Sequence, residues 1–171
     1  MKKIAELLVR YNAIEFGDFT LASGSKSKYY IDVKTAVTNP EFLMAIAQEI
    51  AEKYEFEVVA GVAVGGIPLA VATALASKKP FAIIRAESKD HGKKNLIIGD
   101  VAGKKILLVE DVTTSGGSAL YGITILREAG AYADRVVTVV DREQGAEASL
   151  KEQSIDLISL VKVSEILKEK S

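Results

Sequence analysis

The sequence predicts an α/β protein built on a parallel sheet with helices on both faces. Short continuous apolar runs alternate along the chain with segments of helical spacing, the pattern of strand–helix–strand units. The apolar runs have the length of strands that are buried on both faces. The chain of 171 residues has the length of one domain, so we expect a single domain over residues 1–171.

The N-terminal part precedes this alternation. Residues 2–13 are expected to form an amphipathic helix, because their apolar side chains recur at helical spacing. Two short extended pieces follow, at 19–21 and 29–33, with a polar turn between them. Asn39 then predicts the start of a helix over 40–54, since Asn caps free amides and the Pro that follows suits a first turn.

From residue 58 onward the strands and helices alternate. The apolar runs expected to form strands are 58–64, 81–84, 106–109, 136–140 and 157–161. The helical segments expected between them are 67–77, 118–129 and 147–153. Ligands of such sheets bind beyond the C-terminal ends of the strands, so we expect the functional residues there.

The composition excludes several classes of function. The 22 Lys and Arg residues balance 23 Asp and Glu residues, which argues against a generally basic nucleic-acid surface. There is no Cys, which excludes a disulfide framework, a zinc–thiolate site and a Cys nucleophile. The single His excludes a metal site built from several His side chains. We expect a cytosolic protein.

An uncharged stretch over 58–77 has the length of a membrane span. It contains Gly61, Gly65, Gly66 and Pro68, which fit a buried strand, a loop and a buried helix better than a helix crossing lipid. We therefore expect no membrane segment. Acidic and basic residues interrupt the first apolar positions of the chain, so we also expect no secretory signal.

The segment 105–120, KILLVEDVTTSGGSAL, contains the strongest functional signal. An apolar strand leads into Glu110 and Asp111, and a turn of small hydroxyl and glycine residues then opens a helix. The free amides of such a turn and the positive end of the helix dipole suit a phosphate. The two acids suit sugar hydroxyls or a hydrated Mg²⁺. The alternative is an ordinary strand, turn and helix cap with solvated acids.

Other nucleotide motifs do not fit. A P-loop needs a Lys that this turn lacks, and the glycine fingerprint of dinucleotide-binding proteins is absent. A phosphorylated receiver domain needs acids at an early strand end, and residues 61–66 contain none.

The segment resembles the 5-phosphoribosyl 1-diphosphate (PRPP) motif of type I phosphoribosyltransferases. Three further segments, 19–34, 85–92 and 140–145, resemble orotate phosphoribosyltransferases in the same order, so the similarity spans nearly the whole chain. The resemblance implies a type I phosphoribosyltransferase-like parallel sheet flanked by helices, with a small N-terminal hood. It also implies transfer of phosphoribosyl from PRPP to orotate, giving orotidine 5′-monophosphate and pyrophosphate in pyrimidine biosynthesis.

The resemblance assigns roles to the turn and its acids. Glu110 and Asp111 would hold the ribose hydroxyls and orient Mg²⁺ through water, with no direct metal ligand from the protein. Thr114 would contact the base as well as the phosphate. The residues that would bind the 5′-phosphate of PRPP are Val112, Thr113, Thr114, Ser115, Gly116, Gly117 and Ser118.

The loop 85–95 is rich in basic side chains, including Arg85, Lys89 and His91. Such a composition is common in solvated surface loops, but beside a phosphate turn its cations could stabilise the charge of a leaving diphosphate. Gly92 and the lack of apolar anchors predict a loop that closes over the substrate. The resemblance makes it a catalytic loop that reaches the neighbouring subunit's site, and so implies a homodimer.

Arg142 follows the strand 136–140 and lies between Asp141 and Glu143. It could bind a carboxylate such as that of orotate in a bidentate pair, or it could pair only with the neighbouring acids. The resemblance favours orotate.

Three positions depart from the bacterial pattern, which has Lys where this chain has Ala22, Gly65 and Ala86. The amides of Gly65 and Gly66 could bind diphosphate without a Lys, or the pair could serve close packing of helix on strand. The sequence leaves both readings open.

Two other functions compete. The first is a phosphoribosyltransferase for a purine, for which Arg142 would have no use. The second is a non-catalytic PRPP-binding regulator of RNA or transcription, which the balanced charge and the lack of an appended helix-turn-helix do not favour.

Overall fold

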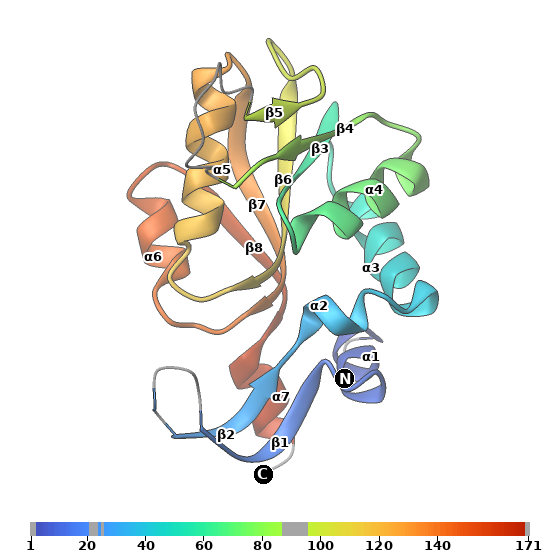
Figure 1. Ribbon diagram of the computed structural model, residues 1–171, viewed down its shortest axis with the longest axis vertical. Helices are drawn as coiled ribbons and strands as arrows, with labels where there is room; N and C mark the ends of the chain where they lie inside the picture. The colour runs from blue at the N-terminus through green and yellow to red at the C-terminus, as the bar shows by residue number, and fades with distance from the viewer. Residues whose placement is uncertain (1–2, 21–23, 25, 87–95, 170–171) are drawn as a thin grey trace.

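A computed structural model describes residues 3–20, 24, 26–86 and 96–169 of the chain. Within these ranges a six-stranded sheet has the strand order β5-β4-β3-β6-β7-β8, and every neighbouring pair is parallel except β4 and β5 (Figure 1). The strands are β3 (Val58–Val62), β4 (Phe81–Ile84), β5 (Ile97–Ile98), β6 (Lys105–Thr113), β7 (Tyr132–Asp141) and β8 (Asp156–Lys162). The expected α/β class is confirmed.

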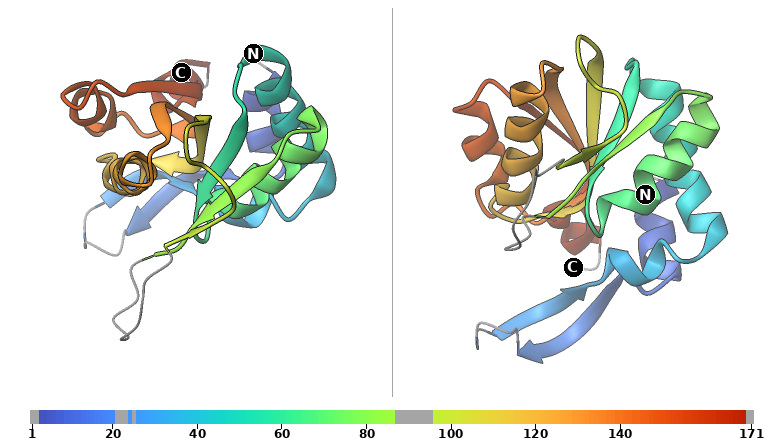
Figure 2. Two further views of the ribbon diagram at one scale, coloured as in Figure 1. Left: turned by 90° about the horizontal axis from the view of Figure 1, so that it is seen from above. Right: turned by 45° about the horizontal axis from the view of Figure 1, so that its top comes forward.

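Helices cover both faces of this sheet (Figures 1 and 2). On one face α1 (Lys3–Arg10), α3 (Pro40–Lys53) and α4 (Gly66–Ser77) share a hydrophobic core with the side chains of Val59, Leu107 and Val109. On the other face α5 (Gly117–Glu128) and α6 (Ala146–Lys151) pack against Val58 and Leu108. Successive strand residues therefore pack into the cores on opposite faces of the sheet. This is why the strands are continuous apolar runs in the sequence.

The remaining elements form the expected hood. The strands β1 (Ile14–Thr20) and β2 (Lys26–Ile31) pair antiparallel as a separate two-stranded sheet, followed by the short helix α2 (Val33–Ala36). Figure 1 shows these elements and α7 (Val163–Glu169) below the main sheet, on the side toward which β7 and β8 run. The hood thus lies beyond the C-terminal strand ends, where ligands of such sheets bind.

Several predicted boundaries were wrong. The strand expected at 106–109 continues to Thr113, and the strand expected at 136–140 continues to Asp141. The ladder between them still pairs Val112 with Val140, so the acids that suggested a strand end lie inside a paired strand. The strand expected over 58–64 ends at Val62, and β1 starts well before the extended piece expected at 19–21.

Other elements follow the expectations or were missed. Asn39 caps α3 as predicted, since its Oδ1 accepts hydrogen bonds from Glu41 N (2.9 Å) and Phe42 N (3.3 Å). The short elements β5, α2 and α7 were not predicted. The stretch 58–77 forms β3 and α4, and no helix in the described ranges is long and apolar enough to cross a membrane.

Close contact between β3 and α4 requires two glycines. A Cβ on Gly61 would lie 2.2 Å from the Gly66 carbonyl oxygen, and a Cβ on Gly66 would lie 2.7 Å from the Val109 carbonyl oxygen. Both obstacles are backbone atoms, which cannot rotate away. For Gly66, close packing of helix on strand therefore accounts for the glycine.

We expect Gly66→Ala to lower the free energy of unfolding by about 1–3 kcal/mol, because the added methyl must separate α4 from β6. The free energy is measured by urea denaturation. Gly117→Ala is the matched control, because its Cβ would lie 3.8 Å from Ser115 Oγ, the nearest neighbouring atom among the described residues. It should stay within about 1 kcal/mol of the wild type, and equal losses in both variants would contradict the packing argument.

Candidate active site

Two buried carboxylates lie side by side along β6. Glu110 is 4% exposed and Asp111 is 5% exposed. Successive strand residues point to opposite faces, so Glu110 faces α5 and Asp111 faces α2 and the loop before α4. Ser118 Oγ donates a hydrogen bond of 3.1 Å to Glu110 Oε1, and Lys34 Nζ lies 3.3 Å from Asp111 Oδ2. The alternative of two solvated acids is therefore excluded.

The environment of Glu110 disfavours its charged form. Burial raises the pKa of Glu110 to about 7, and the neighbouring charge of Asp111 contributes in the same direction. The hydrogen bond from Ser118 and the charge of Lys34 oppose this rise only in part. Near neutral pH the Glu110 side chain can therefore carry a proton.

The predicted phosphate turn lines one pocket of about 210 Å³. Gly116 has a φ of +86° at the N-cap of α5, a conformation that suits glycine, and none of the described side chains caps the free amides there. These amides are consequently available to an anion. The residues around the pocket are Glu110, Val112, Thr113, Thr114, Ser115, Gly116, Gly117, Ser118 and Ala119.

A second pocket, of about 350 Å³, adjoins the first. Val112 and Thr114 line both pockets, so the two share a wall. The second pocket brings β2 and α2 of the hood together with the ends of β6 and β7. Its residues are Tyr30, Ile31, Asp32, Val33, Lys34, Asp111, Val112, Thr114 and Arg142.

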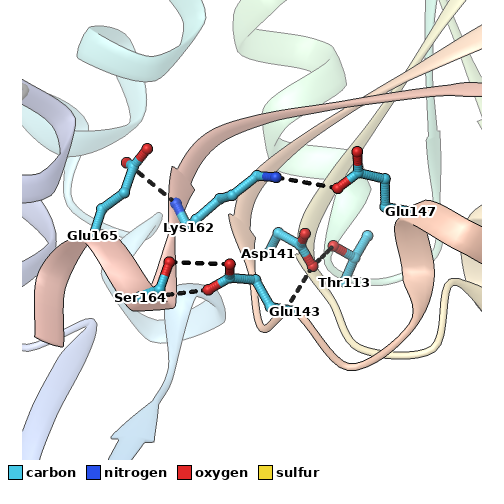
Figure 3. A network of polar contacts seen from close by, with 7 residues as sticks. All are labelled: Thr113, Asp141, Glu143, Glu147, Lys162, Ser164 and Glu165. Carbon is cyan, nitrogen blue, oxygen red and sulfur yellow. Dashed lines mark hydrogen bonds and ion pairs between the residues drawn. The ribbon is translucent and has the colours of Figure 1, made fainter.

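Arg142 is held in this pocket without a salt bridge to its neighbours in sequence. Its backbone N–H donates to the Thr113 carbonyl (2.9 Å), and its guanidinium carbon lies 5.9 Å from the centre of the Tyr29 ring. The buried Nε has no hydrogen-bond partner among the described residues. The carboxylates of Asp141 and Glu143 accept hydrogen bonds from other groups (Figure 3). The guanidinium is thus available to a ligand.

The predicted basic loop is only partly described. Arg85 is exposed at the end of β4, its N–H donates to the Leu96 carbonyl, and its own carbonyl accepts from Tyr121. It is not among the residues that line the two pockets. Lys89 and His91 lie outside the described residues, as do Lys93, Lys94 and Ala22.

Gly65 has a role that neither sequence reading anticipated. A Cβ at this position would lie 2.5 Å from the Asp111 carboxyl group. The bacterial pattern has Lys at this position, and in the present arrangement a Lys would displace Asp111. The cation beside Asp111 here is Lys34 instead.

Lys34 is the principal residue that the sequence reasoning missed. It belongs to α2, whose cap is Asp32: Oδ1 accepts from Thr35 N (3.0 Å) and Oδ2 from Thr35 Oγ1 (2.6 Å). That local cap was a readable signal for a helix start. Nothing local indicated that Lys34 meets Asp111, because the two lie far apart along the chain. In the described ranges no group of three or more His, Cys, Asp or Glu side chains could hold a metal ion.

Comparisons with known proteins agree with this geometry. The family model of the phosphoribosyl transferase domain matches residues 32–165. The orotate phosphoribosyltransferase of Methanocorpusculum labreanum is 63% identical over 98% of this chain and 99% of that protein. The orotate phosphoribosyltransferase of Methanocaldococcus jannaschii is 46% identical over 96% of this chain and 95% of that protein.

Solved structures agree as well. The crystal structure of orotate phosphoribosyltransferase from Aeropyrum pernix has a TM-score of 0.84 at 30% identity, covering 98% of this chain and 97% of that one. The Mycobacterium tuberculosis orotate phosphoribosyltransferase in complex with PRPP has a TM-score of 0.78 at 27% identity, covering 96% and 97%. The chain therefore belongs to the phosphoribosyltransferase family and, within it, to the orotate phosphoribosyltransferases.

Proposed function

We propose that the protein transfers the phosphoribosyl group of PRPP to N1 of orotate, giving orotidine 5′-monophosphate and pyrophosphate. The observation that carries the proposal is the pair of adjoining pockets, one at a phosphate turn and one beside Arg142, whose buried Nε has no partner in the part of the chain that the structure describes. Glu110 lines the first pocket and Asp111 lines the second, and both precede Val112 of the shared wall along β6. Ribose placed there would join a phosphate on one side to a base on the other.

The first pocket binds the 5′-phosphate through the amides and hydroxyls of residues 112–118, at the N-terminus of α5. Glu110 and Asp111 accept hydrogen bonds from the ribose hydroxyls. When Glu110 carries a proton it adds no second full charge beside Asp111. That limits repulsion between the acids and the phosphates of PRPP.

The second pocket binds orotate. The carboxylate of orotate pairs with the guanidinium of Arg142, which can form a bidentate contact, and Lys34 supplies a second cation. Thr114 contacts the base from the shared wall. Orotate can attack through an anionic N1, so the reaction needs no strong general base. Catalysis then comes mainly from positioning and from stabilisation of developing charge.

The diphosphate needs cations. The two neighbouring carboxylates would hold a hydrated Mg²⁺ through its water ligands, since Mg²⁺ prefers oxygen ligands and keeps several waters. The bound ion would neutralise charge on the diphosphate. Arg85, Lys89 and His91 receive the leaving diphosphate in this proposal, and His91 donates a hydrogen bond or proton to it. A protein without Cys and with these metabolite substrates fits the cytosol.

We also propose a homodimer in which the loop 85–95 reaches the neighbouring subunit's site. Exposed apolar side chains on α4, β4 and β5 support it: Leu75 is 72%, Phe81 40% and Ile98 46% exposed. These elements are neighbours at one edge of the described sheet, and β4 leads directly into the loop. A second copy seated on this edge would cover apolar surface and bring the loop to its partner.

With PRPP and Mg²⁺, we expect turnover of orotate and none of hypoxanthine in a spectrophotometric assay with a panel of bases.

Arg142→Ala and Lys34→Ala should each raise the KM for orotate about tenfold or more, since each removes a charge-assisted contact. Lys89→Ala should instead lower kcat. Lys53→Ala, which removes an ion pair with Glu49 on α3, is the control and should leave kcat and the KM for orotate unchanged. Turnover of hypoxanthine but not orotate would refute the proposed substrate.

Glu110→Gln should make the protein more stable at alkaline pH. Because the pKa of Glu110 is raised from 4.5 to about 7, ionisation destabilises the fold. The cost is absent below pH 4.5, grows between 4.5 and 7, and reaches on the order of 3 kcal/mol above 7. The melting temperature of the variant should exceed that of the wild type clearly at pH 8 and little at pH 5. Glu147→Gln, at an exposed acid, is the control; a gap for Glu110→Gln that does not depend on pH would contradict the raised pKa.

Sedimentation equilibrium should give a dimer for the wild type and a monomer for Leu75→Glu, because a charge on this face opposes its burial. Tyr132→Glu is the control, since Tyr132 is also 69% exposed but begins β7, away from α4. It should remain dimeric. A monomeric wild type would rule out the dimer.

A further inference from the structure

The loop that carries Arg142 is hydrogen-bonded at its start to β6, through Asp141 and Thr113 (Figure 3). Asp141, which is 2% exposed, ends β7. Its Oδ1 accepts hydrogen bonds from Thr113 Oγ1 (3.2 Å) and from the backbone N–H of Glu143 (3.0 Å). The residues on either side of Arg142 are thus joined to each other and to the strand that carries the acid pair.

The same loop is hydrogen-bonded through Glu143 to α7, the C-terminal helix. Glu143 Oε2 accepts a hydrogen bond of 2.7 Å from Ser164 N, and Glu143 Oε1 accepts one of 3.0 Å from Ser164 Oγ. These hydrogen bonds hold the pKa of Glu143 below its usual range. Figure 3 shows the Glu143 side chain extended toward Ser164 at the start of α7. Both carboxylate oxygens are therefore occupied by α7 and not by Arg142.

The backbone at Glu143 indicates that this contact has a purpose. Glu143 has a φ of +56°, in the left-handed region that residues with a Cβ disfavour. In this conformation Glu143 is directed to α7 while Arg142 lines the base pocket. A disfavoured backbone persists where surrounding contacts select it, and at Glu143 these contacts come from Ser164 and Asp141.

We propose that Glu143 and Ser164 are positioning residues that hold the guanidinium of Arg142 in the base pocket. Neither residue is among those lining the pocket, so both act through Arg142. Recognition of the base would then depend on the contact of α7 with the 142–145 loop. The inference rests on the proposed function, in which Arg142 binds the carboxylate of orotate.

Steady-state kinetics with orotate and PRPP test the proposal. We expect Glu143→Ala to raise the KM for orotate about tenfold, since a cation displaced by about 1 Å loses most of its effect. The KM for PRPP and the kcat at saturating orotate should stay within about twofold, and Ser164→Ala should show the same split with a smaller change. Glu143→Gly, which accepts the positive φ but cannot bind Ser164, should also raise the KM for orotate.

Glu147→Ala is the matched control. Glu147 is a nearby acid whose exposed side chain pairs with Lys162 at 3.1 Å and makes no contact with Ser164 in the network drawn in Figure 3. Its loss should leave every kinetic constant unchanged. A normal KM for orotate in Glu143→Ala, or an equal rise in the KM for PRPP, would overturn the proposal.

A double-mutant cycle shows whether Glu143 acts through Arg142. In the Arg142→Ala background, Glu143→Ala should have no further effect on the KM for orotate. A full additional effect there would overturn the positioning role.

A readout without activity separates this inference from the proposed function. In protein labelled with [¹⁵N]arginine, the Nε–H signal of Arg142, assigned with Arg142→Lys, should exchange slowly in the wild type and rapidly in Glu143→Ala. Unchanged exchange would overturn the positioning role whatever the substrate. Absence of orotate turnover in the wild type would refute the proposed function. The exchange rates would still show whether Glu143 positions Arg142.

Discussion

The site depends on one constraint: two adjacent carboxylates are buried within the central strand of a sheet. The alternation of side chains along β6 sends Glu110 to the α5 side and Asp111 to the α2 side. The two acids differ in their surroundings and in their tendency to ionise, because a buried charge without a partner is costly. Lys34 stands beside Asp111, whereas Glu110 has a hydroxyl donor and a raised pKa. Acids of unlike character thus face the two pockets from a single strand.

Much of this arrangement is local in sequence and was therefore predictable. The strand, the acids, the turn and the first residues of α5 all lie within 105–120, so their order alone predicted a phosphate site at a strand end. The alternation of apolar runs with helical segments likewise predicted the sheet and the helices α3, α4, α5 and α6. In each case the signal is the spacing of residues that are near neighbours along the chain.

The rest depends on contacts that sequence patterns do not record. The ends of β6 and β7 were misjudged because polar residues ordinarily signal a strand end, and here the ladder continues through them to Thr113 and Asp141. The short elements β5, α2 and α7 have too few residues to show a period. Lys34 and Asp111 meet only in the fold, as do Glu143 and Ser164. Gly65 is a third example, because a side chain at this position would collide with Asp111, which is distant in the sequence.

The wall that Val112 and Thr114 contribute to both pockets has a thermodynamic consequence. Any shift of this wall that accompanies occupation of one pocket is transmitted to the other without an intervening chain of residues. Linkage then requires the effect to be mutual: if a phosphate in the turn tightens the hold on a base, the base tightens the hold on the phosphate by the same factor. Two ligands that share a wall in this way are linked in their affinities to the extent that either one shifts the wall.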